Sequence, residues 1–401
     1  MATPIREVIR LLLNSDIAEA GRMLFDNNPL SLVCSHVCPQ ENQCEGNCVL
    51  GKKGSPVQIS AIERYISDYY LNVFKPQKST RENGLIAIIG SGPAGITIAF
   101  ILSSRNYDVT IFDSHDRIGG VMRYGMPDFR LPRIVLDRLA DALVLSGVRI
   151  RPNTVIGANL TVDDLLADGF RAIFMGTGVW KPRRLNVPGE SLGHVHYAIE
   201  YLKNPDVYRL GRRLAVIGAG NVAMDVARTA FRHGCEEVTI LCNADESGVT
   251  ARTVELDYAK IDGAKLLLKK SVVRIVDEGV VLTDSRIEQD EEGRTTAYPG
   301  GGAEELLAVD SVIIAVGQGP RAVIVSSTTG IDVNERGLVA VDDEGRTSRE
   351  GIFASGDVVT GAKTVVEAVK VSRRVADAMD RFVQEKYGPG TAKRRTETSG
   401  A

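Results

Sequence analysis

Two glycine-rich turns, each between a short apolar run and a helical segment, constrain this 401-residue chain more than any other feature. The first turn is G-S-G-P-A-G from Gly90, after the apolar run 85–89, and the second is G-A-G-N-V-A from Gly218, after the run 214–217. An apolar strand, a Gly-x-Gly-x-x-Gly/Ala turn and a helix begin a dinucleotide-binding unit. The turns lie too far apart for a short solenoid repeat, so they predict two separate nucleotide-binding domains.

The first turn carries a different demand at each glycine. Gly90 allows the tight turn, Gly92 lets the backbone approach a pyrophosphate, and Gly95 lets the helix pack on the strand. The helix N-terminus then presents a partial positive charge to the phosphates. Asp113 follows the next strand, 108–112, where an acid can accept hydrogen bonds from ribose hydroxyls. A chance glycine-rich turn is the alternative, but the complete strand, helix and acid favour a site made of Gly90, Gly92, Pro93, Ala94, Gly95 and Asp113.

Two further segments fit the same ligand. Gly119-Gly120 would again let backbone approach a dinucleotide, and G-I-F-A-S-G-D-V-V at 351–359 precedes a long amphipathic helix, 364–384. Asp357 can place a carboxylate on a sugar-alcohol chain, and the helix start can present N–H groups to a ring carbonyl. An ordinary acid of a helix N-terminal turn is the alternative for Asp357. The site residues expected here are Gly119, Gly120, Gly356, Asp357, Thr364 and Val365.

The second turn has Gly218, Gly220 and, in the third position, Ala223, which still permits close packing. Its next strand, 237–241, ends at Cys242-Asn243-Ala244, without the acid typical of NAD sites or the Arg that binds a 2′-phosphate. Arg252 is the nearest candidate cation, and Asn243 could hydrogen-bond ribose hydroxyls. The alternative is a domain that keeps its fold but has lost nucleotide affinity.

Four of the six cysteines fall within 15 residues, spaced C-x3-C-x5-C-x3-C. Four thiolates this close can enclose one [4Fe–4S] cube or one tetrahedral zinc ion. The C-x2-C pairs of structural zinc are missing, and Pro39 after Cys38 resembles the Cys-Pro found beside iron–sulfur cubes, so we favour iron–sulfur. The surrounding segment predicts short helices at 5–13, 18–25 and 57–74, a small domain that an embedded cofactor would help to hold. The candidate ligands are Cys34, Cys38, Cys44 and Cys48, while Cys235 and Cys242 fit core packing.

Composition and missing motifs exclude several classes. A net charge of −3 provides no global positive field for nucleic acid. No apolar run is long enough for a membrane span, and no secretory signal is evident, so we expect a reducing cytoplasm. The sequence has no C-x-x-C motif and no P-loop motif. Hydride transfer from nicotinamide to a flavin needs no protein acid or base, so we predict no catalytic side chain.

These segments together resemble the small (beta) subunit of glutamate synthase, a family similar to part of dihydropyrimidine dehydrogenase and to the large subunit of NADH-dependent ferredoxin:NADP oxidoreductases. The resemblance spans roughly residues 15–387 and adds Y-G-M-P-D-F-R-L-P, G-T-G at 176–178, A-V-G-Q and G-D-V-V to the motifs above. It implies FAD in the first domain, NADPH or NADH in the second, and electron exchange between nicotinamide, FAD, iron–sulfur clusters and a larger partner subunit in a hetero-oligomer. It adds these cofactor-binding positions: Arg130, Gly178, Asn221, Val222 and Gly317.

Three departures from the family carry expectations of their own. Relatives usually have a further N-terminal cysteine set, for which this chain begins too late, so we expect Cys34 to complete one cluster instead of two. Glu63, which matches a ligand position of the second cluster, is then expected to be structural. Many relatives have paired Arg where this chain has Asn243-Ala244, so NADP specificity does not transfer. The usual A-x-A-D-G-R is A-V-K-V-S-R here, which leaves the flavin contacts near Lys370 open.

We therefore predict an α/β fold with two Rossmann-like domains of the glutathione-reductase type, the NAD(P) domain inserted in the FAD domain, after a small α-helical iron–sulfur domain. The expected boundaries are 1–80 for the helical domain, 84–195 and 311–387 for the FAD domain, 196–310 for the NAD(P)H domain, and 388–401 for a disordered tail. The predicted function is electron transfer between NAD(P)H and a partner subunit. One form of this function is transfer within an electron-bifurcating complex. The alternatives are an accessory subunit without nicotinamide binding and a zinc-stabilised flavoprotein.

Overall fold

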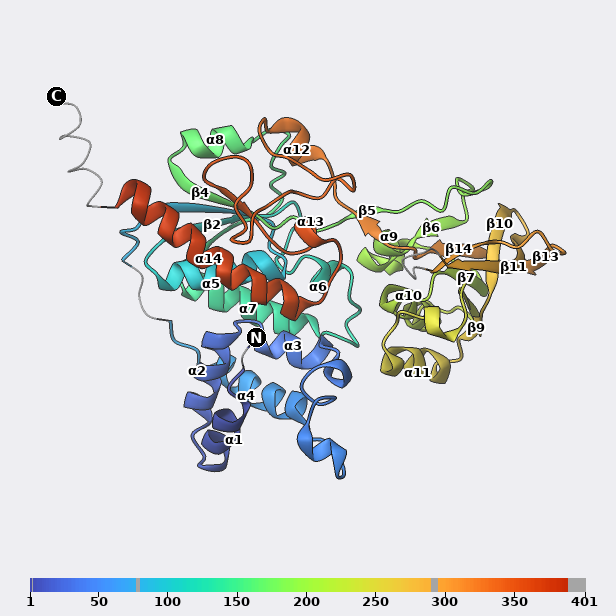
Figure 1. Ribbon diagram of the computed structural model, residues 1–401, viewed down its shortest axis with the longest axis horizontal. Coiled ribbons are helices and arrows are strands. Elements are labelled where there is room, and N and C mark those ends of the chain that lie inside the picture. Colours follow the sequence, from blue (N-terminus) through green and yellow to red (C-terminus); the bar gives the residue numbers. More distant parts are fainter. Residues whose placement is uncertain (2, 77–79, 290–294, 389–401) are drawn as a thin grey trace. The chain divides into compact units, whose positions relative to one another are not determined.

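The computed structural model describes residue 1 and residues 3–76, 80–289 and 295–388. The chain divides into two compact units, and Figure 1 shows their elements. The first unit contains residues 1–123, 128–179 and 319–401, and the second contains 124–127 and 180–318. Apart from Gly388, the expected C-terminal tail lies outside the described residues.

The first unit begins with a group of helices, as the sequence predicts. Apolar residues at helical spacing bury one face of each helix, and the core between them contains Val8, Leu11, Ala20, Leu24 and Ile66. The side chain of Asp16 caps the second helix by accepting a hydrogen bond from the backbone N–H of Glu19. The elements are α1 (Ile5–Leu13), α2 (Ile17–Asn27), α3 (Ser31–Val37), two 3-10 turns (Gln40–Asn42 and Val49–Lys52) and α4 (Ile59–Val73).

A five-stranded parallel sheet in the order β16-β4-β1-β2-β3 forms the rest of the first unit. Its central strand, β1, is a continuous apolar run because helices cover both faces of the sheet. In Figure 1, α5, α7 and α14 lie against one face of this sheet, with α8 on the other. The strands are β1 (Leu85–Ile89), β2 (Asp108–Phe112), β3 (Arg149–Arg151), β4 (Phe170–Met175) and β16 (Ile352–Ala354). The helices are α5 (Pro93–Ser104), α6 (Val121–Tyr124), α7 (Arg133–Leu145), α8 (Val162–Ala167), α12 (Val323–Ser327), α13 (Asp357–Thr360) and α14 (Val365–Tyr387).

The second unit repeats this plan with the strand order β6-β14-β7-β8-β9. The helices α9 (Ala198–Lys203), α10 (Asn221–Arg232) and α11 (Thr253–Ile261) share one apolar core with this sheet. An antiparallel sheet packs its apolar side into a second core on β7 and β14. The strands of the unit are β6 (Val195–Tyr197), β7 (Arg213–Ile217), β8 (Glu237–Leu241), β9 (Lys265–Leu267), β10 (Lys270–Val276), β11 (Gly279–Gln289), β12 (Thr295–Pro299), β13 (Glu305–Ala308) and β14 (Ser311–Ile314), with the short β5 (Lys181–Pro182) and β15 (Gln318–Gly319) at its ends.

The division between the units differs from the sequence-based boundaries for a topological reason. Strand β14 hydrogen-bonds between β6 and β7, so residues 311–314 belong to the second sheet and not to the returning FAD segment. The chain leaves the first unit after residue 179 and returns to it at residue 319. The inserted segment is therefore longer at both ends than the predicted 196–310.

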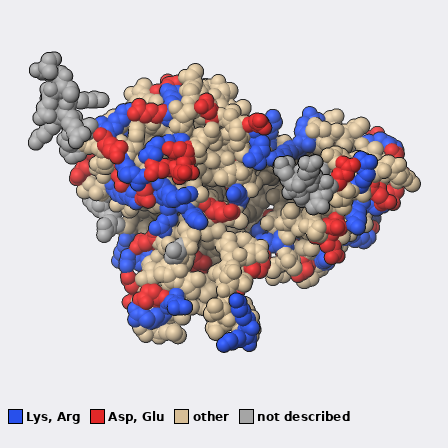
Figure 2. All heavy atoms as spheres, in the orientation of Figure 1, with Lys and Arg blue, Asp and Glu red and all other residues tan. Residues whose placement is uncertain are grey.

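Two properties of the surface and helices complete the description. Figure 2 shows Lys and Arg interspersed with Asp and Glu on the visible face of each unit. In the described part of the chain, no helix combines the length and apolar composition that a membrane span requires.

Candidate functional site

In the turn between β1 and α5, two of the three motif glycines have backbone atoms where a Cβ would stand, and the third has open space there. Gly90 has φ +98°, and a Cβ there would stand 2.6 Å from the carbonyl oxygen of Gly176. A Cβ on Gly95 would overlap the carbonyl oxygen of Gly90. A Cβ on Gly92, in contrast, would meet nothing within 4 Å. The turn thus leaves free space over Gly92, where a pyrophosphate would approach the start of α5, and it fits a dinucleotide.

Asp113, at the end of β2, lies against this same turn. Its carboxylate accepts hydrogen bonds from the N–H of Ser91 at 2.7 Å, from the Ser91 hydroxyl, and from the N–H of His115 at 2.8 Å. Burial alone would raise the pKa of Asp113, but the hydrogen bonds from His115 and Ser91 outweigh it and hold the pKa below its usual value. Asp113, the predicted ribose-binding acid, is therefore ionised, and its hydrogen bonds from Ser91 stabilise the glycine turn.

The second glycine pair reaches the same turn from another part of the chain. The N–H of Gly119 donates to the carbonyl of Ser91 at 3.0 Å, and a Cβ on Gly120 would stand 2.8 Å from the Cα of Gly92. The C-terminal segment arrives too, since a Cβ on Gly356 would stand 3.1 Å from the Cβ of Ala94. Four predicted segments therefore meet at the carboxyl ends of β1, β2 and β16, where an open parallel sheet binds its ligand.

The start of the long C-terminal helix is fixed by a reciprocal cap. The Thr364 hydroxyl accepts from the N–H of Glu367 at 3.3 Å, and the Glu367 carboxylate accepts from the N–H of Thr364 at 3.0 Å. Asp357 accepts a hydrogen bond from the N–H of Lys363 at 3.2 Å, and burial raises its pKa to about 6. The structure holds this half-buried carboxylate beside the capped start of α14.

Two further residues of the first predicted site are Arg130 and Gly178, and the segment around Lys370 lies on α14. Arg130 is half-buried between α6 and α7, and Gly178 follows β4 with φ +69°. Lys370 is exposed on α14, while the neighbouring Ser372 is fully buried and its hydroxyl lies 2.8 Å from the Ser355 hydroxyl. The A-V-K-V-S-R departure therefore places a polar pair between α14 and the loop after β16.

The second glycine turn has the same construction in the second unit. Gly218 has φ +119°, and a Cβ there would stand 2.6 Å from the carbonyl oxygen of Ala315. The loop after β8 folds back onto this turn, because the N–H of Ala251 donates to the carbonyl of Ala219 at 3.0 Å. The side-chain oxygen of Asn221 accepts from the N–H of Arg252 at 2.9 Å. Asn221 thus ties the glycine turn to the loop that carries Arg252.

The other predicted residues of this site are dispersed around that turn. Asn243 is exposed directly after β8 and Cys242, and Val222 packs against the helical core of the unit. Gly317 has φ +108° and accepts a hydrogen bond from the N–H of Arg183 at 3.0 Å. The Arg252 side chain is only 10% exposed, and its guanidinium lies 4.0 Å from the Glu255 carboxylate.

The cysteine segment presents the predicted ligands on a short helix and two turns. Cys34 is buried on α3, and Cys38 follows one helical turn later. A hydrogen bond to Cys38 and burial raise the pKa of the Cys34 thiol, so these two sulfurs lie together. Backbone N–H groups, the first that of Val57, lower the pKa of the half-buried Cys48. Four cysteines are a suitable donor set for an iron–sulfur cube, although among the described residues no three His, Cys, Asp or Glu side chains stand together as ligands for a metal ion.

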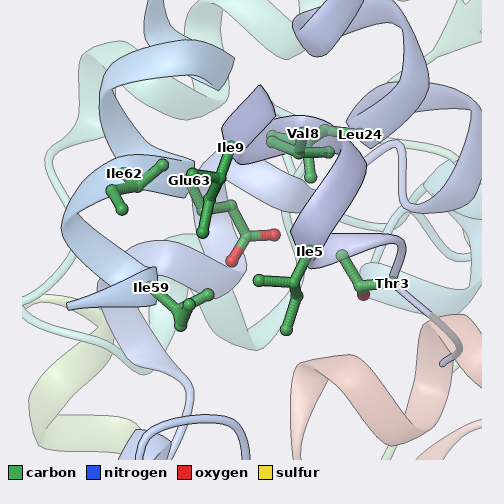
Figure 3. A pocket seen from close by; sticks show the side chains of 8 residues that line it. All are labelled: Thr3, Ile5, Val8, Ile9, Leu24, Ile59, Ile62 and Glu63. Atoms are coloured by element: carbon green, nitrogen blue, oxygen red, sulfur yellow. The ribbon is translucent and has the colours of Figure 1, made fainter. Parts of the chain in front are cut away.

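Glu63 lies near these cysteines in an apolar setting. Figure 3 shows its carboxylate pointing into a cavity of about 20 Å³ between α1 and α4, which has room for about one water molecule. Burial raises the pKa of Glu63 to about 7. The other lining residues are Thr3, Ile5, Val8, Ile9, Leu24, Ile59 and Ile62.

Some residues at these sites gave no signal of their own in the sequence. Ser91 and His115 complete the hydrogen bonds of Asp113, and Glu255 binds both Arg252 and Arg228, the latter at 3.1 Å. Ser91 stands between Gly90 and Gly92 in the first glycine motif, so its place in the motif was a signal that could have drawn attention to it. Arg252 lies three residues before Glu255, but no local pattern predicts the contact with Arg228, because it forms only through the packing of α10 against α11.

Comparison with known proteins agrees with this architecture. Residues 84–372 match the pyridine nucleotide-disulphide oxidoreductase family, and residues 1–73 match dihydropyrimidine dehydrogenase domain II, 4Fe-4S cluster. Among solved structures, FprA of Mycobacterium tuberculosis in complex with NADPH superposes with a TM-score of 0.66 at 20% identity, over 78% of this chain and 86% of that one. At this identity the likeness shows the fold, and it confirms the predicted fold class.

Curated relatives narrow the class further. The glutamate synthase [NADPH] small chain of Halomonas elongata is 33% identical over 396 residues, covering 92% of this chain and 84% of that one. The NAD-dependent dihydropyrimidine dehydrogenase subunit PreT of Salmonella typhimurium is 31% identical over 386 residues, covering 94% and 88%. The chain therefore belongs to the pyridine nucleotide-disulphide oxidoreductase family, in the group that contains the glutamate synthase small chains. It is an FAD-containing NAD(P)H oxidoreductase with a 4Fe–4S domain, which confirms the predicted enzyme class and cofactors.

Proposed function

We propose that this chain is the electron-transferring subunit of a larger complex, exchanging electrons between NAD(P)H and a protein partner through FAD and one [4Fe–4S] cluster. The observation that carries the proposal is the presence, in one chain, of two independently built dinucleotide turns and a four-cysteine helical domain. The relatives' names support a subunit role, since they are a small chain and a subunit.

The protein's own contribution is to hold and orient its cofactors. FAD, when bound, supplies the chemistry that accepts hydride from a nicotinamide and passes electrons on. The Gly90–Gly95 turn and the start of α5 would hold its pyrophosphate, with Gly120 and Gly356 alongside. The Gly218–Gly220 turn would hold the nicotinamide dinucleotide in the second unit. No proton donor or acceptor is assigned for this transfer.

Cys34, Cys38, Cys44 and Cys48 are the proposed ligands of the cluster. They are the only cysteines in the helical domain, and they lie within the residues that match the 4Fe-4S family. Cytoplasmic conditions, which keep thiols reduced and supply NAD(P)H, suit such a set.

An anaerobic titration of the purified full chain tests the electron-transfer proposal. With NADH or NADPH we expect the flavin absorbance near 450 nm to bleach, and an added one-electron dye to be reduced. No bleaching with either nucleotide would favour the accessory subunit that binds FAD and the cluster without nicotinamide.

The ligand set is tested by iron and sulfide content. Cys34→Ser should lose most of both, because a cube needs four thiolates, while Cys235→Ser, a buried cysteine of the second unit, serves as the matched control. Wild-type iron and sulfide in Cys34→Ser would remove Cys34 from the set. One zinc ion and no iron in the wild type would support the zinc-stabilised alternative.

A further inference from the structure

The loop after β8 occupies the position at which dinucleotide-binding folds distinguish the two nicotinamide cofactors. The β8–β9 ladder continues to Cys242, whose N–H donates to the carbonyl of Leu267 at 2.9 Å, and Asn243 is the first exposed residue beyond it. At this place an acid usually receives the ribose 2′-hydroxyl, or an Arg receives a 2′-phosphate. We propose that this loop selects NADH over NADPH, with Asn243 hydrogen-bonded to the ribose hydroxyls and Asp245 repelling a 2′-phosphate. The inference rests on the proposed function, because it requires the second unit to bind a nicotinamide dinucleotide.

The first charged residue after β8 is Asp245, whose carboxylate is held in place by the loop itself. Asp245 accepts hydrogen bonds from the N–H of Ser247 at 3.0 Å and from its hydroxyl at 2.6 Å. These bonds lower the pKa of Asp245, so it is ionised at neutral pH. Glu246 adds a second, exposed carboxylate.

Two cations near this loop, Lys269 and Arg252, each lie close to an acid. Lys269 donates its N–H to the carbonyl of Ala244 at 2.9 Å, and its ammonium lies close enough to Asp245 to help lower the pKa of that carboxyl. The backbone N–H of Arg252 donates to the Asn221 side chain. The Arg252 side chain is 10% exposed, and its guanidinium lies 4.0 Å from the Glu255 carboxylate. A 2′-phosphate would have to compete with Glu255 for that guanidinium.

The discrimination follows from charge. A phosphate monoester carries about −1.5 to −2 charges at pH 7. Beside Asp245 and Glu246 it would meet repulsion, with no bidentate guanidinium to offset it. The unphosphorylated ribose brings two neutral hydroxyls, which an exposed amide such as Asn243 can both donate to and accept from.

The test compares two ligands that differ only in the 2′-phosphate. Isothermal titration calorimetry on the full, FAD-loaded chain measures the affinities of ADP-ribose and of 2′-phospho-ADP-ribose. We expect ADP-ribose to bind about tenfold tighter or more, and NADH to bleach the flavin at correspondingly lower concentration than NADPH. Equal affinities, or tighter binding of the phosphorylated ligand, would overturn the selectivity while leaving the proposed function standing. Binding of neither ligand, with no bleaching by either nucleotide, would overturn both.

Single substitutions test the proposed roles of Asn243 and Asp245 separately. Asn243→Arg, at an exposed position, should raise the affinity for 2′-phospho-ADP-ribose about tenfold by adding a charge-assisted hydrogen bond. Residue 244 is less suitable, because Ala244 packs closely against Gly248. Asp245→Asn keeps a capping side chain but removes the charge, so it should shift the affinity ratio several-fold toward the phosphorylated ligand.

Two further variants complete the design. Glu278→Gln removes an exposed carboxylate on the β10–β11 turn and should leave the ratio unchanged. Arg252→Ala should affect both ligands alike, whereas a selective loss of 2′-phospho-ADP-ribose binding would show that Arg252 does hold the phosphate and would overturn the proposal.

Discussion

The glycines of the β1–α5 turn, taken one residue at a time, separate folding from binding. A Cβ on Gly95 overlaps backbone, whereas a Cβ on Gly92 stands in open space at φ −71°, a conformation that alanine adopts freely. The two positions therefore carry different demands although the motif treats them alike. Gly95 serves the packing of α5, and we propose that Gly92 serves the ligand.

Gly92→Ala and Gly95→Ala should accordingly differ. Gly92→Ala is expected to keep the unfolding free energy of the FAD-free chain within about 0.5 kcal/mol while strongly reducing bound FAD, because the methyl group occupies the pyrophosphate's approach. Gly95→Ala should, besides reducing bound FAD, lower the unfolding free energy by about 1–3 kcal/mol. Urea unfolding and the flavin-to-protein absorbance ratio check both, and a full FAD complement in Gly92→Ala would contradict the assignment.

Asp310 is a residue whose contribution depends on pH. It accepts hydrogen bonds from the backbone N–H groups of Arg212 at 2.8 Å and Arg213 at 2.9 Å, and from the Arg213 guanidinium at 2.8 Å. The Arg213 side chain is the main cause that lowers the pKa of Asp310 to about 2, so the stabilisation is present above the unfolded value of 3.8 and is lost as the pH falls toward 2.

Asp310→Asn should therefore destabilise the second unit at pH 7 by about 1 kcal/mol, a value reduced for solvent screening because the side chain is 34% exposed. The difference from wild type should shrink as the pH approaches 2. Urea unfolding at several pH values measures it, with the exposed Asp277→Asn as control. A difference independent of pH would show that the charge of Asp310 is not the cause.

At the scale of elements, strands were predicted more closely than helices. The runs 85–89, 108–112 and 237–241 form strands with those bounds, because a strand buried on both faces is mainly apolar. Helix α3 was not predicted, since seven residues hold too few turns to show a period. Yet α3 carries Cys34, so an element without a pattern positions a proposed ligand.

The N-terminal cap of α14 gives the prediction at this scale. Thr364→Ala removes the hydroxyl that accepts from the Glu367 N–H and should lower the unfolding free energy by about 1 kcal/mol, whereas Thr364→Ser should retain most of it. Urea denaturation measures the difference. Equal losses in both variants would mean that the methyl group of Thr364, and not its hydroxyl, stabilises the helix start.

For the whole molecule, the first unit joins a helical domain to a nucleotide-binding sheet through a few specific contacts. Arg373 of α14 donates to the backbone carbonyls of Asp26 and Asn27 at the end of α2. Arg138 of α7 donates to the Asp68 carboxylate at 2.6 Å. Phe25 packs edge-on against Phe100 of α5, with ring centroids 5.1 Å apart. The helical domain thus contacts α14, α7 and α5, and the last of these is the helix that begins at the first glycine turn.

Arg373→Ala should loosen this attachment. We expect faster hydrogen exchange in α2 and α4, with no change in the second unit, because the carbonyls at the end of α2 lose their donor. Arg374→Ala, an exposed neighbour on the same helix, is the matched control. Unchanged exchange in Arg373→Ala would show that the apolar contacts suffice.

The sequence by itself determined the fold class, the two dinucleotide turns and the cysteine set, because each depends on residues close together in the chain whose spacing matches a local geometry. It also determined that the nucleotide-binding segments return after residue 350. Only the tertiary structure decided which unit β14 joins, that Asp113 accepts hydrogen bonds from Ser91, and that Arg228 meets Glu255. These outcomes depend on strand order and on side chains brought together across the fold, and no local period or spacing encodes contacts of that kind.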